Sequence, residues 1–145
     1  PVDKPVEIRS IQMHDVDVKS APAGARVGLA LKNILSKAVD RGHVISNDEI
    51  LTTDFSLKCT LSQFTKRLDV GVMLHLFVGL QSAPVRVKKI VMNGEVADYA
   101  ASGSECVLTL SGSKKVAYSE SDRFIIANLD DKQRFVGYGF CDRSP

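Results

Sequence analysis

Arg26 is the side chain near the start of the chain that is best placed to bind a charged group. It begins a segment in which the small residues Gly28 and Ala30 alternate with larger apolar ones. Because small residues leave the backbone open to close approach, a guanidinium beside them could make a forked contact with a carboxylate or phosphate. The alternative is a solvated surface arginine, which composition alone favours.

Other residue types that do chemistry are too scattered for the common catalytic and metal sites. The three histidines, at positions 14, 43 and 75, lack the spacing of zinc ligands. No P-loop, serine elbow or zinc-protease motif is present. We therefore expect no catalytic residue and no metal site. His75 lies in an apolar run, where a packed and hydrogen-bonded core histidine is the expected interpretation.

The cysteines favour an intracellular protein, and the charge balance leaves its partners open. Cys59, Cys106 and Cys141 form no close pair in the sequence, which argues against a disulfide framework and favours a reducing, cytosolic compartment. Cys59 and Cys106 fall in apolar alternation and are expected in the core. The net charge of +2 permits RNA contact without requiring it. No apolar run is long enough to cross a membrane.

Period-two alternation in the first third of the chain predicts strands. Residues 6–13 and 26–34 flank a turn at residues 21–24, where Pro22 fixes φ and Gly24 can take a positive φ. Arg41 and Gly42 are expected to form a turn that leads into a third strand. The polar residues 46–49 predict a domain boundary there.

The rest of the chain also has an all-β pattern. Residues 50–61 alternate cleanly and should open a second barrel, and Asn93-Gly94 is a hairpin signal. Residues 72–78 are so uniformly apolar that we expect them to be buried on both faces. Turns are expected at residues 79–84 and 111–115. A last hairpin should join residues 123–128 to 134–141.

Five stretches carry a resemblance to a known family. They are M-H at 13–14, A-G-A-R-V-G at 23–28, R-G-H-V at 41–44, and the longer segments 72–87 and 122–140. In this order they resemble domain II and domain III of the translational GTPases, and within them the SelB-like elongation factors. The resemblance is nearest to the archaeal SelB-like factors proposed for pyrrolysine-using methanogens.

The resemblance implies two small antiparallel β-barrels. Residues 1–48 would be the C-terminal part of the domain II barrel and residues 49–145 the domain III barrel, and Pro1 is expected to lie inside a longer protein. A partial barrel leaves an unpaired strand edge and an apolar face. Another copy of the chain, another partner, or packing on the second barrel would have to complete it.

The resemblance also supplies candidate binding residues. His14 matches the histidine of the family's M-H motif, and Arg26 matches the position that contacts the aminoacyl group, so both are expected at the pocket for the aminoacyl end of tRNA. The family's usual aspartate before that position is Ala25 here, which changes the charge of the pocket. Without the resemblance, His14 is equally well a strand-end histidine that binds nothing.

In domain III the family's contact regions imply a set of residues for the tRNA backbone. For the arginines, a solvated cross-strand charge is the alternative, and Lys114 and Lys115 are expected to be a solvated turn. The candidate set is Gln81, Ser82, Arg86, Asn128 and Arg134.

The function implied is the aminoacyl-tRNA-binding portion of a SelB-like elongation factor, which delivers a specialised aminoacyl-tRNA to the ribosome in the cytoplasm. This portion would not be an enzyme and would hold no cofactor, because GTP and Mg²⁺ belong to the factor's own GTPase domain. The alternative is a β-barrel interaction module that couples to the GTPase domain without binding RNA. An unrelated small β enzyme would need a polar cleft with a perturbed acid or base.

Overall fold

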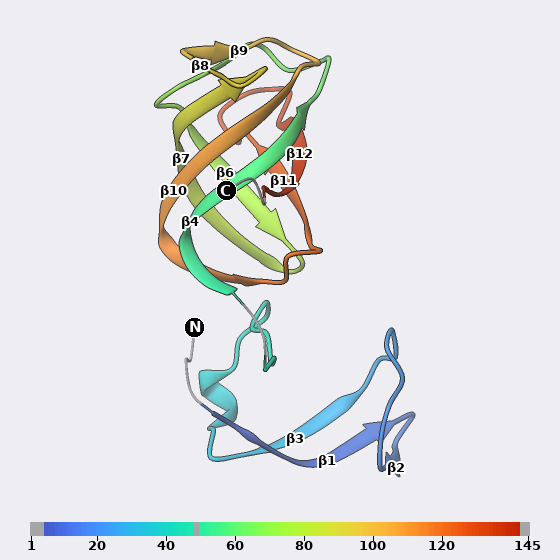
Figure 1. Ribbon diagram of the computed structural model, residues 1–145. Helices are drawn as coiled ribbons and strands as arrows, with labels where there is room; N and C mark the ends of the chain where they lie inside the picture. The colour runs from blue at the N-terminus through green and yellow to red at the C-terminus, as the bar shows by residue number, and fades with distance from the viewer. Residues whose placement is uncertain (1–4, 48–49, 143–145) are drawn as a thin grey trace. The chain divides into compact units, whose positions relative to one another are not determined.

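The computed structural model describes residues 5–47 and 50–142 (Figure 1). Contacts divide the chain into two compact units, residues 1–40 and 41–145. The predicted domain boundary between residues 48 and 49 lies outside the described residues and stays a prediction. Within the described part, no helix is long and apolar enough to cross a membrane.

The first unit is an open, three-stranded antiparallel sheet in the order β2-β1-β3. β1 spans Glu7–Met13, β2 spans Val16–Val18 and β3 spans Gly28–Lys32, followed by a short 3₁₀ turn at Ser36–Ala38. The strand predicted after Arg41-Gly42 is wrong, because residues 43–46 take no strand geometry. The third strand is instead β2, which a tight turn at His14-Asp15 folds back onto β1.

The second unit is a closed barrel of six antiparallel strands, in the order β10-β4-β12-β11-β6-β7, with β7 pairing back to β10 (Figure 1). β8 pairs antiparallel with the end of β7. β5 pairs with β9 in a separate small sheet. The all-β class is confirmed. The strands are β4 Ile50–Leu61, β5 Leu68–Asp69, β6 Met73–Val78, β7 Gln81–Met92, β8 Glu95–Ala97, β9 Tyr99–Ala100, β10 Glu105–Tyr118, β11 Arg123–Ala127 and β12 Phe135–Cys141.

Alternating apolar residues on the six strands fill the barrel interior. On β4, Phe55, Leu57 and Cys59 are buried, as the alternation predicts. The Phe124 ring lies 5.1 Å from Tyr118 in an edge-to-face contact, a favoured aromatic geometry. Gly137 on β12 packs so closely on β4 that a Cβ there would overlap the Thr60 carbonyl oxygen. β12 therefore packs tightly against β4 at this glycine.

Four predictions about the barrel strands are wrong. β6 is not buried on both faces, because Leu74 and Leu76 point inward while Met73 is exposed. His75 consequently lies half-buried on the outer face, with its ring 6.5 Å from that of Phe77, and is not a core histidine.

The other two errors concern turns. Residues 111–115 form no turn, because β10 runs on to Tyr118 and absorbs them as an irregularity in its pairing with β4. Residues 81–84 belong to β7, so the turn after β6 is confined to Gly79 and Leu80.

Candidate functional site

His14 and Arg26 lie at the same end of the first unit's sheet. The last pair between β1 and β3 is Gln12 with Gly28. His14 follows Gln12 by two positions and Arg26 precedes Gly28 by two. Because strands in an antiparallel pair run in opposite directions, continuing this register sets the two residues opposite each other. Both side chains are exposed.

Two turns hold these residues in place. His14 and Asp15 both have positive φ, 50° and 63°. This conformation is typical of tight two-residue hairpin turns, whose twist matches that of the flanking strands. Arg26 follows the turn at Pro22, where the Ala25 N–H donates to the Pro22 carbonyl at 3.2 Å and Gly24 takes a φ of 84°. His14 is therefore in a turn and not at a strand end.

Polar groups surround this end of the sheet. The Gln12 side chain donates from Nε2 to Oδ1 of Asp17 at 2.9 Å, and the exposed residues Gly28 and Ala30 continue from Arg26 along β3. A Cβ at Gly28 would meet only Gln12 at an ordinary 3.9 Å. The arrangement sets an imidazole and a guanidinium at the end of a sheet whose β3 carries exposed small residues, which suits a small polar or anionic group.

In the barrel, the candidate residues fall into two groups. Arg86 on β7 pairs with Met73 at the start of β6, and the β6–β11 ladder ends with His75 opposite Ala127, immediately before Asn128. Ser82 pairs with Phe77, near the other end of β6. Arg86 and the loop from Asn128 to Arg134 are thus at one end of this sheet, and Gln81 and Ser82 are at the other.

Several of these side chains already have partners in the barrel. The Gln81 side chain donates from Nε2 to the Ala117 carbonyl at 2.5 Å and accepts from the Ala117 N–H at 3.0 Å. Arg86 donates from Nη1 to the Gly71 carbonyl at 2.7 Å. Asn128 accepts from the Asp130 N–H at 3.1 Å. Arg86 and Arg134 remain exposed, whereas the side-chain amide of Gln81 is already hydrogen-bonded to the Ala117 backbone.

Sequence analysis missed Lys114 as a neighbour of Ser82. Lys114 lies on β10 and donates from Nζ to the Ser82 carbonyl at 2.8 Å. It is therefore held against β7 and is not part of a solvated turn. Only the continuity of β10 through the residues predicted to be a turn brings this cation to Ser82.

An exposed aromatic surface on the outside of the barrel was also missed. The Arg123 guanidinium stacks on Phe140 at 5.3 Å and on Tyr138 at 5.7 Å, and a hollow of about 600 Å³ opens beside both rings. The signal was the alternation of aromatic residues with Gly137 and Gly139. We name this surface the aromatic face; it comprises Lys58, Thr60, Phe77, Arg123, Ile125, Tyr138 and Phe140, which neighbour one another across β4, β12, β11 and β6.

Two of the three cysteines, Cys59 and Cys106, offer no nucleophile for this surface, whereas Cys141 is partly exposed and lines the hollow. Cys59 and Cys106 face each other across β4 and β10 inside the barrel. Burial raises the pKa of Cys106 to about 11 and that of Cys59 further still, so neither is a reactive thiolate near neutral pH. Within the part of the chain that the structure describes, no group of three or more His, Cys, Asp or Glu residues could hold a metal ion.

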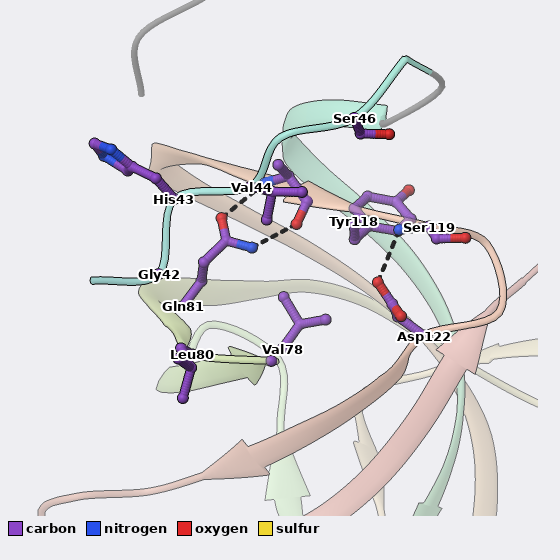
Figure 2. Close-up of a pocket in the computed structure, with 12 residues that line it drawn as sticks. Gly42, His43, Val44, Ser46, Val78, Leu80, Gln81, Tyr118, Ser119 and Asp122 are labelled. Atoms are coloured by element: carbon purple, nitrogen blue, oxygen red, sulfur yellow. Dashed lines mark hydrogen bonds between the residues drawn. The ribbon is translucent and has the colours of Figure 1, made fainter. Parts of the chain in front are cut away.

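A second pocket lies at the end of the barrel where β6 turns into β7 (Figure 2). Its volume is about 400 Å³. The turn after β10 closes one side, where the Ser119 N–H donates to Oδ2 of Asp122 at 2.8 Å. Residues 42–46 form another side. The lining therefore mixes backbone turns with apolar groups, and it includes the ionisable residues His43 and Asp122.

Comparison with known proteins connects this architecture to translation. No sequence model of a protein family matches the chain. The structure resembles translation elongation factor SelB from Methanococcus maripaludis in its apo form, with a TM-score of 0.77 and 26% identity over 95% of this chain and 33% of that one. The chain is therefore similar to SelB elongation factors in both sequence and fold. SelB bound to the GTP analogue GppNHp gives a TM-score of 0.78 at 25% identity, covering 95% of this chain and 34% of that one.

Curated sequences agree with the structural match to SelB. The selenocysteine-specific elongation factor of Methanocaldococcus jannaschii is 26% identical over 96% of this chain and 33% of its own length. An uncharacterized protein of the same organism is 34% identical over 96% of this chain and 42% of its own length. The chain thus spans about a third to two fifths of the length of these relatives. The resemblance to SelB expected from the sequence motifs is confirmed.

Proposed function

We propose that this chain forms the aminoacyl-tRNA-binding portion of a SelB-like elongation factor, which delivers a specialised aminoacyl-tRNA to the ribosome. The observation that carries the proposal is the match to SelB along 95% of the chain, together with the placement of His14 and Arg26 at one end of the same sheet. This placement is consistent with a shared binding role for the two residues.

In this proposal, the first unit holds the aminoacyl end of the tRNA. Arg26 donates to a carbonyl or anionic group of the aminoacyl ester, and His14 approaches from the β1–β2 turn. Because position 25 is alanine, no carboxylate competes there for the guanidinium. Charge-assisted hydrogen bonds of this kind contribute about 1.5–3 kcal/mol, which is enough to separate charged from uncharged tRNA.

The barrel contacts the tRNA backbone in this proposal. Arg86, Asn128 and Arg134 lie at one end of the β7-β6-β11 sheet, and their contacts to phosphate and sugar would orient the tRNA without reading its bases. Ser82 would contribute from the other end through the neighbouring Lys114. Gln81 acts indirectly, since its amide supports the backbone at Ala117.

The remaining parts of the activity are assigned outside these residues. GTP and Mg²⁺ would be held by the factor's own GTPase domain, and no catalytic role is assigned to this chain. The open edges of the β2-β1-β3 sheet would be paired by other strands of the factor or by another copy of the chain. The compartment is the cytoplasm, where the ribosome and charged tRNA are found.

Binding of charged and uncharged tRNA by the intact factor tests the proposal. Arg26→Ala is expected to weaken binding of charged tRNA by about tenfold or more and to leave uncharged tRNA unaffected. Arg9→Ala is the matched control, because it removes an exposed arginine from the same sheet. Equal loss from both variants, or no preference for charged tRNA in the wild type, would refute the aminoacyl pocket.

The aromatic face favours a second function, docking on a protein such as the factor's own GTPase domain. Exposed aromatic residues are enriched at protein interfaces, and this surface carries Tyr138 and Phe140 beside a hollow. Tyr138→Ser with Phe140→Ser should weaken binding of the separate GTPase domain in a calorimetric titration. If tRNA affinity falls while the binding of the GTPase domain is unchanged, the surface belongs to the RNA site.

A further inference from the structure

One side of the barrel carries an excess of positive charge. The strands β4, β10 and β7 lie next to one another, with β10 in the middle (Figure 1). Their charged residues are all exposed, so they stand on the outside of the barrel. We name the outer side of these three strands the basic face. Its six cations are Lys58, Arg86, Lys88, Lys89, Lys114 and Lys115, and its two carboxylates are Asp54 and Glu105.

The charge of this face differs from that of the rest of the chain. Six cations and two carboxylates give the basic face a net charge of +4, whereas the whole chain has a net charge of +2, so all other residues together carry −2. On the opposite strands β6, β11 and β12, Arg123 is the single residue among Lys, Arg, Asp and Glu. Positive charge is thus concentrated on one side of the barrel.

The strand register sets the cations around small polar side chains. On β10, Thr109 lies between Ser56 of β4 and Lys89 of β7. Val107, two positions earlier, lies opposite Lys58 of β4. Because neighbouring strands are about 4.8 Å apart, β4 and β7 are about 10 Å apart across β10. Cations therefore stand on both sides of a central strip that carries hydroxyl groups.

The carboxylate of Asp54 leaves the lysines of β7 without a salt bridge. Hydrogen bonds from Ser111 and Thr53 lower the pKa of Asp54, and the charge of Lys88 adds to this effect. Thr53 donates from Oγ1 to Oδ2 of Asp54 at 2.9 Å. Among the described residues, no salt bridge involves Lys88 or Lys89. Both ammonium groups are therefore accessible to a ligand.

This chemistry suits the phosphate backbone of a nucleic acid duplex. Phosphate oxygens are contacted by Lys and Arg and by Ser and Thr hydroxyls, and the basic face offers both kinds of group. Protein interfaces are instead enriched in aromatic residues, and single strands bind where bases stack on aromatic rings. The two aromatic residues of these strands, Phe55 and Tyr118, are buried. A duplex, which is recognised by its shape and its backbone, therefore fits the face best.

We propose that the basic face is a second RNA-binding surface, which holds the phosphate backbone of an RNA duplex other than the aminoacyl-tRNA. The cyclic strand order places β10 opposite β11, so the face is centred away from the loop of residues 128–134 that we assign to tRNA. Lys88, Lys89 and Thr109, at the middle of the face, are not among the residues assigned to tRNA. The choice of RNA over DNA rests on the proposed function, whereas the charge and the placement of the face do not.

Titration of a labelled RNA duplex of about 16 base pairs with the full 145-residue chain, followed by fluorescence anisotropy, tests this surface. Lys88→Gln with Lys89→Gln should weaken binding at least about tenfold at low salt and reduce the salt slope by about two, because two phosphate contacts are lost. Lys19→Gln with Lys37→Gln is the matched control, since it removes two exposed charges from the first unit. Lys88→Arg with Lys89→Arg keeps the charge and should bind like the wild type.

Three results of this titration would overturn the inference. The first is that the wild type binds no RNA duplex at low salt. The second is an equal loss of affinity in the control variant, which would mean that net charge alone is responsible. The third is displacement of the duplex by polyglutamate at equal charge concentration, which would assign the face to an acidic protein.

Binding of aminoacyl-tRNA by the intact factor separates this surface from the proposed function. Lys88→Gln with Lys89→Gln should leave both the affinity for tRNA and the preference for charged tRNA unchanged. An equal loss of tRNA and duplex affinity would make the face part of the tRNA site and would overturn the second surface. If the wild type binds no duplex but still loses its preference for charged tRNA on Arg26→Ala, only the second surface fails and the proposed function stands.

Discussion

The two units are built from the same kind of strand, yet only one of them has a core. Six strands of the barrel enclose the buried apolar side chains, whereas no described residue of the first unit is buried. Closure removes the edges of a sheet, and the open β2-β1-β3 sheet keeps its edges. The barrel can therefore fold on its own contacts, while the first unit presents its residues to whatever binds it.

The largest difference between the units should appear in thiol labelling. Cys106 is buried in the barrel and Val16 is 63% exposed on β2, so we compare Cys106 with Val16→Cys in a Cys141→Ala background. Cys106 can react only when the barrel opens, and burial raises its pKa to about 11, which lowers its thiolate fraction at pH 8. Labelling at Val16→Cys should be at least about a thousandfold faster. Similar rates would mean that the barrel core is not closed.

A second contrast compares glycines in the two sheets. A methyl group at Gly137 would overlap the Thr60 carbonyl, whereas one at Gly28 meets Gln12 at an ordinary 3.9 Å. Gly137→Ala should lower the free energy of unfolding by about 3 kcal/mol, because the backbone must shift. Gly28→Ala should change it by less than about 0.5 kcal/mol. Urea unfolding followed by circular dichroism measures both, and equal effects would contradict the close packing of β12 on β4.

The smallest contrast compares two glutamines with side-chain hydrogen bonds. The Gln81 side chain makes hydrogen bonds with both backbone groups of the partly buried Ala117. The Gln12 side chain makes one hydrogen bond with the exposed Asp17 side chain. Gln81→Ala should destabilise the barrel by about 1–3 kcal/mol, since it leaves backbone groups without partners. Gln12→Ala should cost less than about 0.5 kcal/mol. The same urea titration measures this difference, which would vanish if water replaced the amide of Gln81.

The sequence predicted the strands of the barrel well and its irregular parts poorly. Alternation located β4, and Asn93-Gly94 located the β7–β8 hairpin, because these signals are local. The serine-, glycine- and lysine-rich residues 111–115 suggested a turn, but pairing with β7 on one side and β4 on the other keeps β10 continuous. Tertiary pairing here outweighs local preference.

The candidate sites, too, could be predicted from the sequence only in part. Residue types and motifs singled out His14 and Arg26, but their shared position at one end of a sheet depends on the β1–β3 register, which shifts between Ile8 and Ser10. A shift of this kind has no clear signature in a single sequence. The aromatic face was missed in part because residues 72–78 were expected to be buried on both faces, whereas the outer surface of the barrel keeps several apolar and aromatic residues exposed.

The central claim is that the first unit recognises the aminoacyl group while the barrel holds the tRNA backbone. We would measure the affinity of the intact factor for charged and uncharged tRNA across a salt series, for the wild type, Arg26→Ala and Arg134→Ala. Arg26→Ala should abolish the preference for charged tRNA with little change in salt slope. Arg134→Ala should keep the preference and reduce the slope by about one. If both variants alter preference and slope together, the two units do not divide the recognition and the account is wrong.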